Sequence, residues 1–198
     1  MADREMNFSI VGMSPLLTHN PASMGSQKDA TPKKGGKKIP TPEEEAEAGL
    51  YVQDGKFCFP GIGIRNSIIK AAADWGPLSG KKRGTLAQSV VHLVLKEEMV
   101  PILEPGGKPV KNYVIDTRRA VVQRQGIKRS RPRFESWRID FTLVYDDVAL
   151  GQNEIEVRGI LENVINDAGK RIGLGDYRPS CKGWFGRFSI NQDGKGRK

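Results

Sequence analysis

A strand that leads directly into a helix is the feature that most restricts how this chain can fold. From Trp137 to Tyr145 apolar and polar residues alternate, which is the period-two pattern of a strand with one buried face. Asn153 and Glu156 then have the spacing of a helix N-cap and its capping-box partner. Apolar residues follow at a helical period as far as Gly169, where we expect the helix to end. One strand and one helix, each with a single apolar face, predict an α+β domain.

The remaining patterns complete a small sheet with two helices. Each further element is predicted from apolar periodicity bounded by Gly, Pro or capping residues. They are a strand over 6–12, a short helix after an N-cap at Thr41, a helix over 60–75, a central strand over 90–95, a hairpin with arms over 113–122 and 136–145, and a final strand over 184–190. This β-α-β-β-α-β order predicts a ferredoxin-like or RRM-like fold, in which both helices cover one face of the sheet and leave the other free for a ligand.

The length of 198 residues suits one domain. We expect a single domain over 1–198, whose parts outside the sheet and helices are rich in Gly, Pro and basic residues. These parts are an inserted loop with a short helix over 19–56, a long basic hairpin over 113–145, a Gly-rich loop over 169–183 and a flexible basic tail over 191–198.

Net charge is the main indication of what the protein binds. There are 32 Lys and Arg against 23 Asp and Glu, a formal charge of +9. Such a surplus favours polyanions, because contacts with phosphates release condensed counterions. The sequence lacks a membrane-length apolar run, a signal-peptide pattern, and the cysteines of a disulfide framework or zinc site. We therefore expect a soluble cytoplasmic protein that binds nucleic acid rather than membranes, with no metal and no other cofactor.

The positive charge is concentrated between residues 118 and 138. This segment contains eight basic residues, seven of them arginine, and the single acid Glu135. Arginine suits forked contacts with phosphates, and Phe134 and Trp137 are candidate surfaces on which bases stack. An exposed hairpin kept soluble by its charge is the alternative. The candidate binding residues here are Arg118, Arg119, Lys128, Arg129, Arg131 and Arg133.

The Gly-rich loop is a second candidate site. Gly173 and Gly175 permit a positive φ and a close approach of backbone N–H groups to a phosphate, although a plain connection is the alternative. The basic residues around them are Lys170, Arg171, Arg178, Lys182 and Arg187. Trp184 and the neighbouring Phe185 either stack on a base or join the core, and the spacing to Phe188 favours the core for Trp184.

The start of the helix at residue 60 is a third candidate. Backbone N–H groups at a helix N-terminus bind anions, and small residues allow a phosphate to approach them. Gly61, Gly63 and Arg65 therefore form a candidate phosphate site.

These features together resemble the RAMP superfamily of CRISPR-associated proteins. GKRIGLGDYRPSCKGWFGRF resembles the Gly-rich loop of that superfamily, FSIVGMSPLLTHN is similar to its first strand and following loop, and FPGIGIRNSIIKAAA to the start of its first helix. The basic hairpin is similar to the thumb of the backbone subunit in CRISPR effectors. The resemblance implies a prokaryotic protein that binds single-stranded guide RNA and assembles along it with copies of itself and with other CRISPR-type subunits. A short relative encoded by a phage or plasmid is also compatible with this resemblance.

Few residues suit catalysis. His92 lies within the predicted central strand, where we expect a core residue. His19, after the first strand, is the better candidate, because some RAMP proteins use a histidine as general acid or base against a ribose 2′-hydroxyl. Asp29 is the other candidate, because some backbone subunits use an aspartate in that loop for metal-assisted RNA cleavage. We expect a non-catalytic binder, with a RAMP-type endoribonuclease and a phage single-stranded DNA-binding protein as the alternatives.

Overall fold

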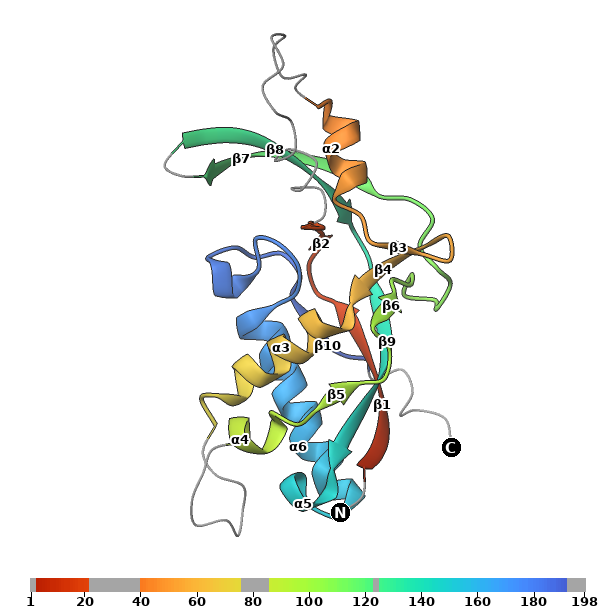
Figure 1. Ribbon diagram of the computed structural model, residues 1–198, viewed down its shortest axis with the longest axis vertical. Coiled ribbons are helices and arrows are strands. Elements are labelled where there is room, and N and C mark those ends of the chain that lie inside the picture. The colour runs from red at the N-terminus through yellow and green to blue at the C-terminus, as the bar shows by residue number, and fades with distance from the viewer. Residues whose placement is uncertain (1–2, 22–39, 76–85, 123–124, 192–198) are drawn as a thin grey trace, which may run out of the picture.

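The computed structural model describes residues 3–21, 40–75, 86–122 and 125–191, which form a mixed α+β architecture, as predicted (Figure 1). The strands are β1 (Asp3–Gly12), β2 (Leu16–Leu17), β3 (Val52–Gln53), β4 (Lys56–Pro60), β5 (Val94–Leu95), β6 (Met99–Pro101), β7 (Val114–Val122), β8 (Gln125–Phe134), β9 (Arg138–Asp146) and β10 (Phe188–Ile190). The helices are α2 (Pro42–Ala48), α3 (Gly61–Ala72), α4 (Leu86–Val90), α5 (Asp147–Leu150) and α6 (Glu154–Asp167). A π-helical turn, Ala168–Ile172, continues α6, and a 3₁₀ turn, Pro179–Cys181, lies before β10.

The largest sheet is antiparallel and has the strand order β10–β1–β9–β5. Its two long central strands, β1 and β9, pair over nine residues, with Met6 opposite Leu143 and Ile10 opposite Ile139. These four side chains are buried. Successive residues of a strand point to opposite faces, so the predicted alternation in both strands places one apolar row in the core.

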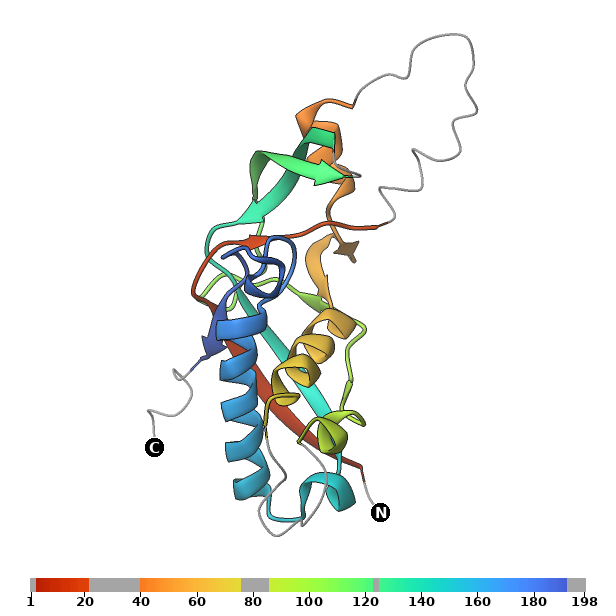
Figure 2. The ribbon, with the colours of Figure 1, turned by 90° about the vertical axis from the view of Figure 1, so that its left-hand side faces the viewer.

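Two helices cover the same face of this sheet (Figure 2). Ile64 and Ile68 of α3 and Leu161 and Val164 of α6 are buried in the core that also holds the apolar rows of β1 and β9. Asn153 is the N-cap predicted for α6, and its side chain accepts from the first-turn N–H groups. None of the described helices is long and apolar enough to cross a membrane.

The central strand predicted over 90–95 is wrong. Val90 ends α4, and only β5 is extended, at the edge of the sheet. The reason is that the apolar run divides between two environments: Val90 and Leu93 are buried, whereas Val94 is exposed. His92 is also exposed and is not the core residue expected.

The pairing predicted for the basic hairpin is also wrong. β7 pairs with β8, from Val114 opposite Arg133 to Val122 opposite Gln125, and β9 pairs with β1 instead. The basic segment is therefore largely a strand rather than a tip. Acidic residues from other parts of the chain, including Glu45 of α2, form ion pairs with its arginines and allow them to lie side by side.

Gly169 does not end the last helix. The helical backbone continues to Ile172, and Gly173, with φ of 74°, follows it. A Cβ on Gly169 would lie 1.9 Å from the carbonyl oxygen of Phe188. Glycine is therefore needed at 169 because β10 packs directly against the helix.

Candidate nucleic-acid interface

A cleft of about 340 Å³ lies between α3 and the loop that follows α6. Five of its lining residues were predicted as site residues from separate stretches of the sequence: His19, Gly63, Gly173, Gly175 and Arg178. The structure thus brings together the loop after the first strand, the start of α3 and the Gly-rich loop.

The α3 side of the cleft also contains residues that the sequence reasoning missed. Asn66, Ser67 and Lys70 line it together with Gly63. These positions are three, four and seven residues after Gly63, which places them on one helical face. That polar row was the signal that could have identified Lys70, whose side chain is exposed at the cleft.

The Gly-rich loop is held by its own hydrogen bonds. The positive φ predicted at Gly173 and Gly175 is confirmed, at 74° and 69°. The N–H of Gly173 donates to the Ala168 carbonyl, and the N–H of Asp176 donates to the Leu17 carbonyl. The glycines therefore determine the shape of the loop. Some of the backbone N–H groups that we expected to bind a phosphate donate to backbone carbonyls of the protein instead.

Arg178 is a half-buried residue that lines the cleft and also holds the loop together. Its guanidinium donates to the Gly175 carbonyl at 2.7 Å and to the Ser180 hydroxyl at 3.0 Å. Ser67 donates to the Gly173 carbonyl at 3.1 Å and joins α3 to the same loop. These hydrogen bonds hold the two sides of the cleft together. The cationic side chains that line it are Lys70 and Arg178.

His19 is a half-buried side chain that also lines the cleft. Burial lowers its pKa below the ordinary 6.5, and the positive charges of Arg131 and Arg129 act in the same direction against the opposing effect of Asp176. The imidazole is therefore neutral at pH 7. The hydroxyl of Tyr51, another cleft residue, donates to the His19 carbonyl at 3.1 Å and fixes the backbone there.

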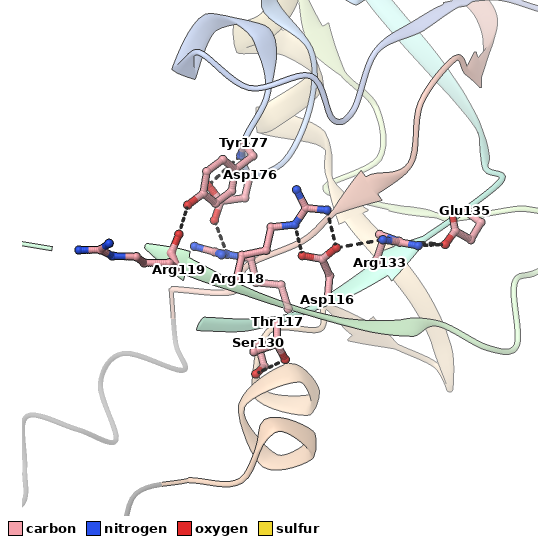
Figure 3. A network of polar contacts seen from close by, with 10 residues as sticks. Asp116, Thr117, Arg118, Arg119, Ser130, Arg133, Glu135, Asp176 and Tyr177 are labelled. Carbon is pink, nitrogen blue, oxygen red and sulfur yellow. Dashed lines mark hydrogen bonds and ion pairs between the residues drawn. The ribbon is translucent and has the colours of Figure 1, made fainter. Parts of the chain in front are cut away.

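Most of the described arginines of the basic hairpin form ion pairs with acidic residues of the protein. Figure 3 shows the Asp116 carboxylate between the guanidinium groups of Arg118 and Arg133. Burial alone would raise the pKa of Asp116, but hydrogen bonds from both arginines outweigh it and lower that pKa.

Two further arginines of the hairpin form ion pairs with other parts of the chain. Arg131 is buried and pairs with Asp176 at 2.6 Å, and Arg129 pairs with a carboxylate of α2 at 2.8 Å. Buried or paired arginines of this kind anchor the hairpin.

Among the described residues of the hairpin, the exposed cations are Arg119 and Lys128. They lie directly opposite each other on β7 and β8. Across the described parts of the chain, neither has an acidic partner in an ion pair. Like charges directly opposite in a ladder are destabilising unless an anion lies near them. Tyr177 of the Gly-rich loop donates to the Arg119 carbonyl at 3.0 Å, so this pair lies next to that loop.

Three aromatic residues differ in burial from what the sequence predicts. Phe134 and Trp137, predicted as stacking surfaces, are buried. Phe134 packs against Phe57, and the indole N–H of Trp137 donates to the Ser14 carbonyl at 2.8 Å. Trp184, predicted to join the core, is exposed, because the final strand begins only at Phe188.

Other predicted site residues lie away from the cleft. Arg171 pairs with Asp167 and Asp74 at the ends of the two helices, and Lys170 lines a separate hollow there. Arg65 donates to the carbonyls of Val91 and Leu93, so it connects α3 to the chain before β5.

Three further predicted residues have local roles. The N–H of Gly61 donates to the Glu98 carbonyl, which occupies a donor of the proposed phosphate site. Lys182 is exposed beside the Gly-rich loop, and the Arg187 carbonyl accepts from the N–H of Met13. Asp29 and residues 192–198 of the tail predicted over 191–198 lie outside the described residues.

The open face of the large sheet is not where the basic residues gather. Arg138 forms a two-pronged pair with its neighbour Asp140, and Thr142 donates to Asn7. Paired charges and acids on this face do not favour a phosphate backbone.

Comparison with protein-family models and with curated proteins gives no match. Among the described residues, His, Cys, Asp and Glu form no group of three that could hold a metal ion. The functional groups that line the cleft include the cations of Lys70 and Arg178, the imidazole of His19, the carboxylate of Asp176 and the rings of Tyr51 and Phe59.

Proposed function

We propose that the protein is a RAMP-type, single-stranded RNA-binding protein that assembles along guide RNA as the backbone of a CRISPR-like ribonucleoprotein. The strand order supports a ferredoxin-like fold. With β1, β5, β9 and β10 taken as strands one to four, the sheet has the order 4-1-3-2, and α3 and α6 follow strands one and three on one face. The β7–β8 hairpin, in the position between strands two and three, would be the thumb.

The observation that carries the proposal is the convergence at the cleft. Residues singled out independently in three segments line one hollow with Lys70 and Arg178 as its cations. Phe59 and Tyr51 add aromatic rings, and Asn66 adds an amide. Cations, rings and hydrogen-bonding groups are what a nucleotide requires: charge for its phosphate, apolar surface for its base, and donors or acceptors for its sugar.

The neighbouring hairpin extends this surface. Arg119 and Lys128 lie on the ribbon that projects beside the Gly-rich loop (Figure 1). A strand of RNA entering the cleft would pass these two exposed cations. Single-stranded RNA fits this path because its phosphates are accessible and its bases are free to turn outward.

A matched pair of lysines tests the proposal. Lys70 and Lys170 are both exposed near the end of a helix, but only Lys70 lines the cleft. Lys70→Gln should weaken binding of a single-stranded RNA oligonucleotide and reduce the slope of log affinity against log salt by about 0.7, the value for one lost phosphate contact. Lys170→Gln should leave both quantities unchanged.

Two outcomes would contradict the proposal. Equal effects of Lys70→Gln and Lys170→Gln would remove the cleft from the binding surface, and an RNA affinity of the wild-type protein that is insensitive to salt would remove the electrostatic basis. If single-stranded DNA of the same sequence competes for the protein as effectively as RNA does, the single-stranded DNA-binding alternative is favoured.

His19 supports RNA cleavage as a second candidate function. A neutral imidazole at pH 7 is able to accept the proton of a ribose 2′-hydroxyl, and Arg178 and Lys70 would stabilise the charge on the phosphate. The 2′ oxygen would attack phosphorus, and the displaced 5′ oxygen would take a proton from water, leaving a 2′,3′-cyclic phosphate and a 5′-hydroxyl.

The cleavage function is separable from binding. RNA incubated with wild-type protein should yield 2′,3′-cyclic phosphate ends, while His19→Ala should bind RNA without cutting it. Intact RNA after incubation with the wild-type protein would exclude this second function and leave the binding proposal standing.

A further inference from the structure

Directly after the Gly-rich loop lies an exposed tryptophan, Trp184, whose surroundings differ from those of the other two tryptophans. Trp184 is 64% exposed, whereas Trp137 is fully buried and Trp75 is half-buried with its indole N–H donating to Asp167. An exposed aromatic side chain is common by itself. The distinguishing feature of Trp184 is the ordered array of planar groups beside it.

This array runs from the basic hairpin to the loop. The guanidinium of Arg118 lies 4.5 Å from the centre of the Phe185 ring, and the Phe185 and Trp184 ring centres are 5.2 Å apart. Asp116 holds Arg118 in place through hydrogen bonds of 2.5 and 2.9 Å. Phe185 is buried and Trp184 is not, so the array ends in solvent at the indole.

The backbone beneath the indole is also fixed. The Ser14 hydroxyl donates to the Trp184 carbonyl at 2.8 Å, and the N–H of Phe185 donates to the Tyr177 carbonyl at 3.1 Å. An aromatic ring on a fixed support loses little conformational entropy when a second ring stacks on it. The site is therefore preorganised for a flat ligand.

The charges near the indole identify which flat ligand it suits. Lys182 is exposed two residues before Trp184, and the exposed Arg119 lies on the hairpin that contacts the same loop. An aromatic ring among cations is the arrangement that binds single-stranded nucleic acid, because the ring stacks on a base while the cations attract the flanking phosphates.

We infer that Trp184 is a stacking platform for one base of the bound RNA and extends the Arg118–Phe185–Trp184 array by one ring. This inference rests on the proposed function and adds a base-binding position to the phosphate contacts of the cleft. Stacking uses the π-face that every base has, so the platform accepts any base.

The test compares Trp184→Ala and Trp184→Phe with Ile155→Ala, a control at another highly exposed apolar residue. The probes are oligo(rA) and inorganic polyphosphate, which carries charge but no bases. Oligo(rA) should quench the tryptophan fluorescence of the wild-type protein. Trp184→Ala should weaken oligo(rA) binding roughly 5- to 150-fold, and Trp184→Phe should recover part of that loss. Ile155→Ala should not change RNA affinity, and Trp184→Ala should not change polyphosphate affinity.

Each contrary result has a distinct meaning. Unchanged oligo(rA) affinity in Trp184→Ala would overturn the stacking inference while the proposed function stands. An equal loss for oligo(rA) and polyphosphate would overturn it too, because the indole would then act on charge or loop structure. Loss of self-association with unchanged RNA affinity would assign Trp184 to a protein interface instead. Failure of the wild-type protein to bind RNA would overturn the proposed function itself.

Discussion

Replacing Gly175 with alanine should destabilise the protein much more than the same replacement at Gly55. The two glycines have nearly identical φ angles, 69° at Gly175 and 70° at Gly55. A Cβ at Gly55 would meet nothing within 4 Å, whereas at Gly175 it would lie 2.1 Å from the Leu17 carbonyl oxygen and 3.0 Å from the Leu16 side chain. The strain of a positive φ is thus common to both, and the crowding is specific to Gly175.

The extra cost at Gly175 follows from what must move. Displacing the Leu17 carbonyl breaks its 2.9 Å hydrogen bond from the N–H of Asp176, a loss of about 0.5–1.5 kcal/mol. Crowding the buried Leu16 adds about 1–3 kcal/mol. We therefore expect Gly175→Ala to reduce the free energy of unfolding by about 1.5–4.5 kcal/mol more than Gly55→Ala does.

Urea denaturation of the wild-type protein and both variants gives these free energies. The melting temperature of Gly175→Ala should lie about 3–18 °C below that of Gly55→Ala. Equal stability of the two variants would mean that the Gly-rich loop does not pack on β2 as the structure has it.

Three further predictions concern charged and titratable groups. The pKa of His19 is lowered from 6.5 in the folded protein, so protonation favours the unfolded chain, and the free energy of unfolding should fall as pH drops below 6.5, less so in His19→Gln. The pKa of Asp116 is lowered from 3.8, so its contribution is present above that pH and lost as pH falls through the lowered value; Asp116→Asn should cost about 1–3 kcal/mol in urea denaturation at pH 7. Glu45→Gln removes the carboxylate that accepts from Arg129 and from the N–H of Ser130, and hydrogen exchange should then become faster in α2 and β8 but not in α6.

Elements whose patterns are local could be predicted from the sequence. β9 and α6 follow from the alternation after Trp137 and the N-cap at Asn153, because burial of one face leaves a periodic record in the chain itself. The pairing of the basic hairpin could not be predicted in this way. The acids that pair with Arg129 and Arg131, Glu45 and Asp176, are more than 40 residues away along the chain, and an isolated run of arginines gives no sign of them.

Several residues of the candidate site could be identified from the sequence, but their positions relative to one another could not. Gly173 and Gly175 could be recognised by their spacing, and their backbones have the predicted positive φ. The exposure of Trp184 was not predicted, because it depends on which side of this segment packs against the hairpin, where the buried Phe185 contacts Arg118. Lys70 was overlooked because the significance of its position on α3 depends on a loop about 100 residues later.

Cross-linking of bound RNA to the full chain tests the central claim most directly. The wild-type protein would be irradiated with an oligonucleotide that carries 4-thiouridine, and the linked peptides would be identified by mass spectrometry. We expect links in residues 63–70 of α3, in residues 172–184, which include most of the Gly-rich loop and Trp184, and beside Arg119 or Lys128 of the hairpin. Links confined to the outer face of β1 and β9, or to the hollow beside Lys170, would contradict it.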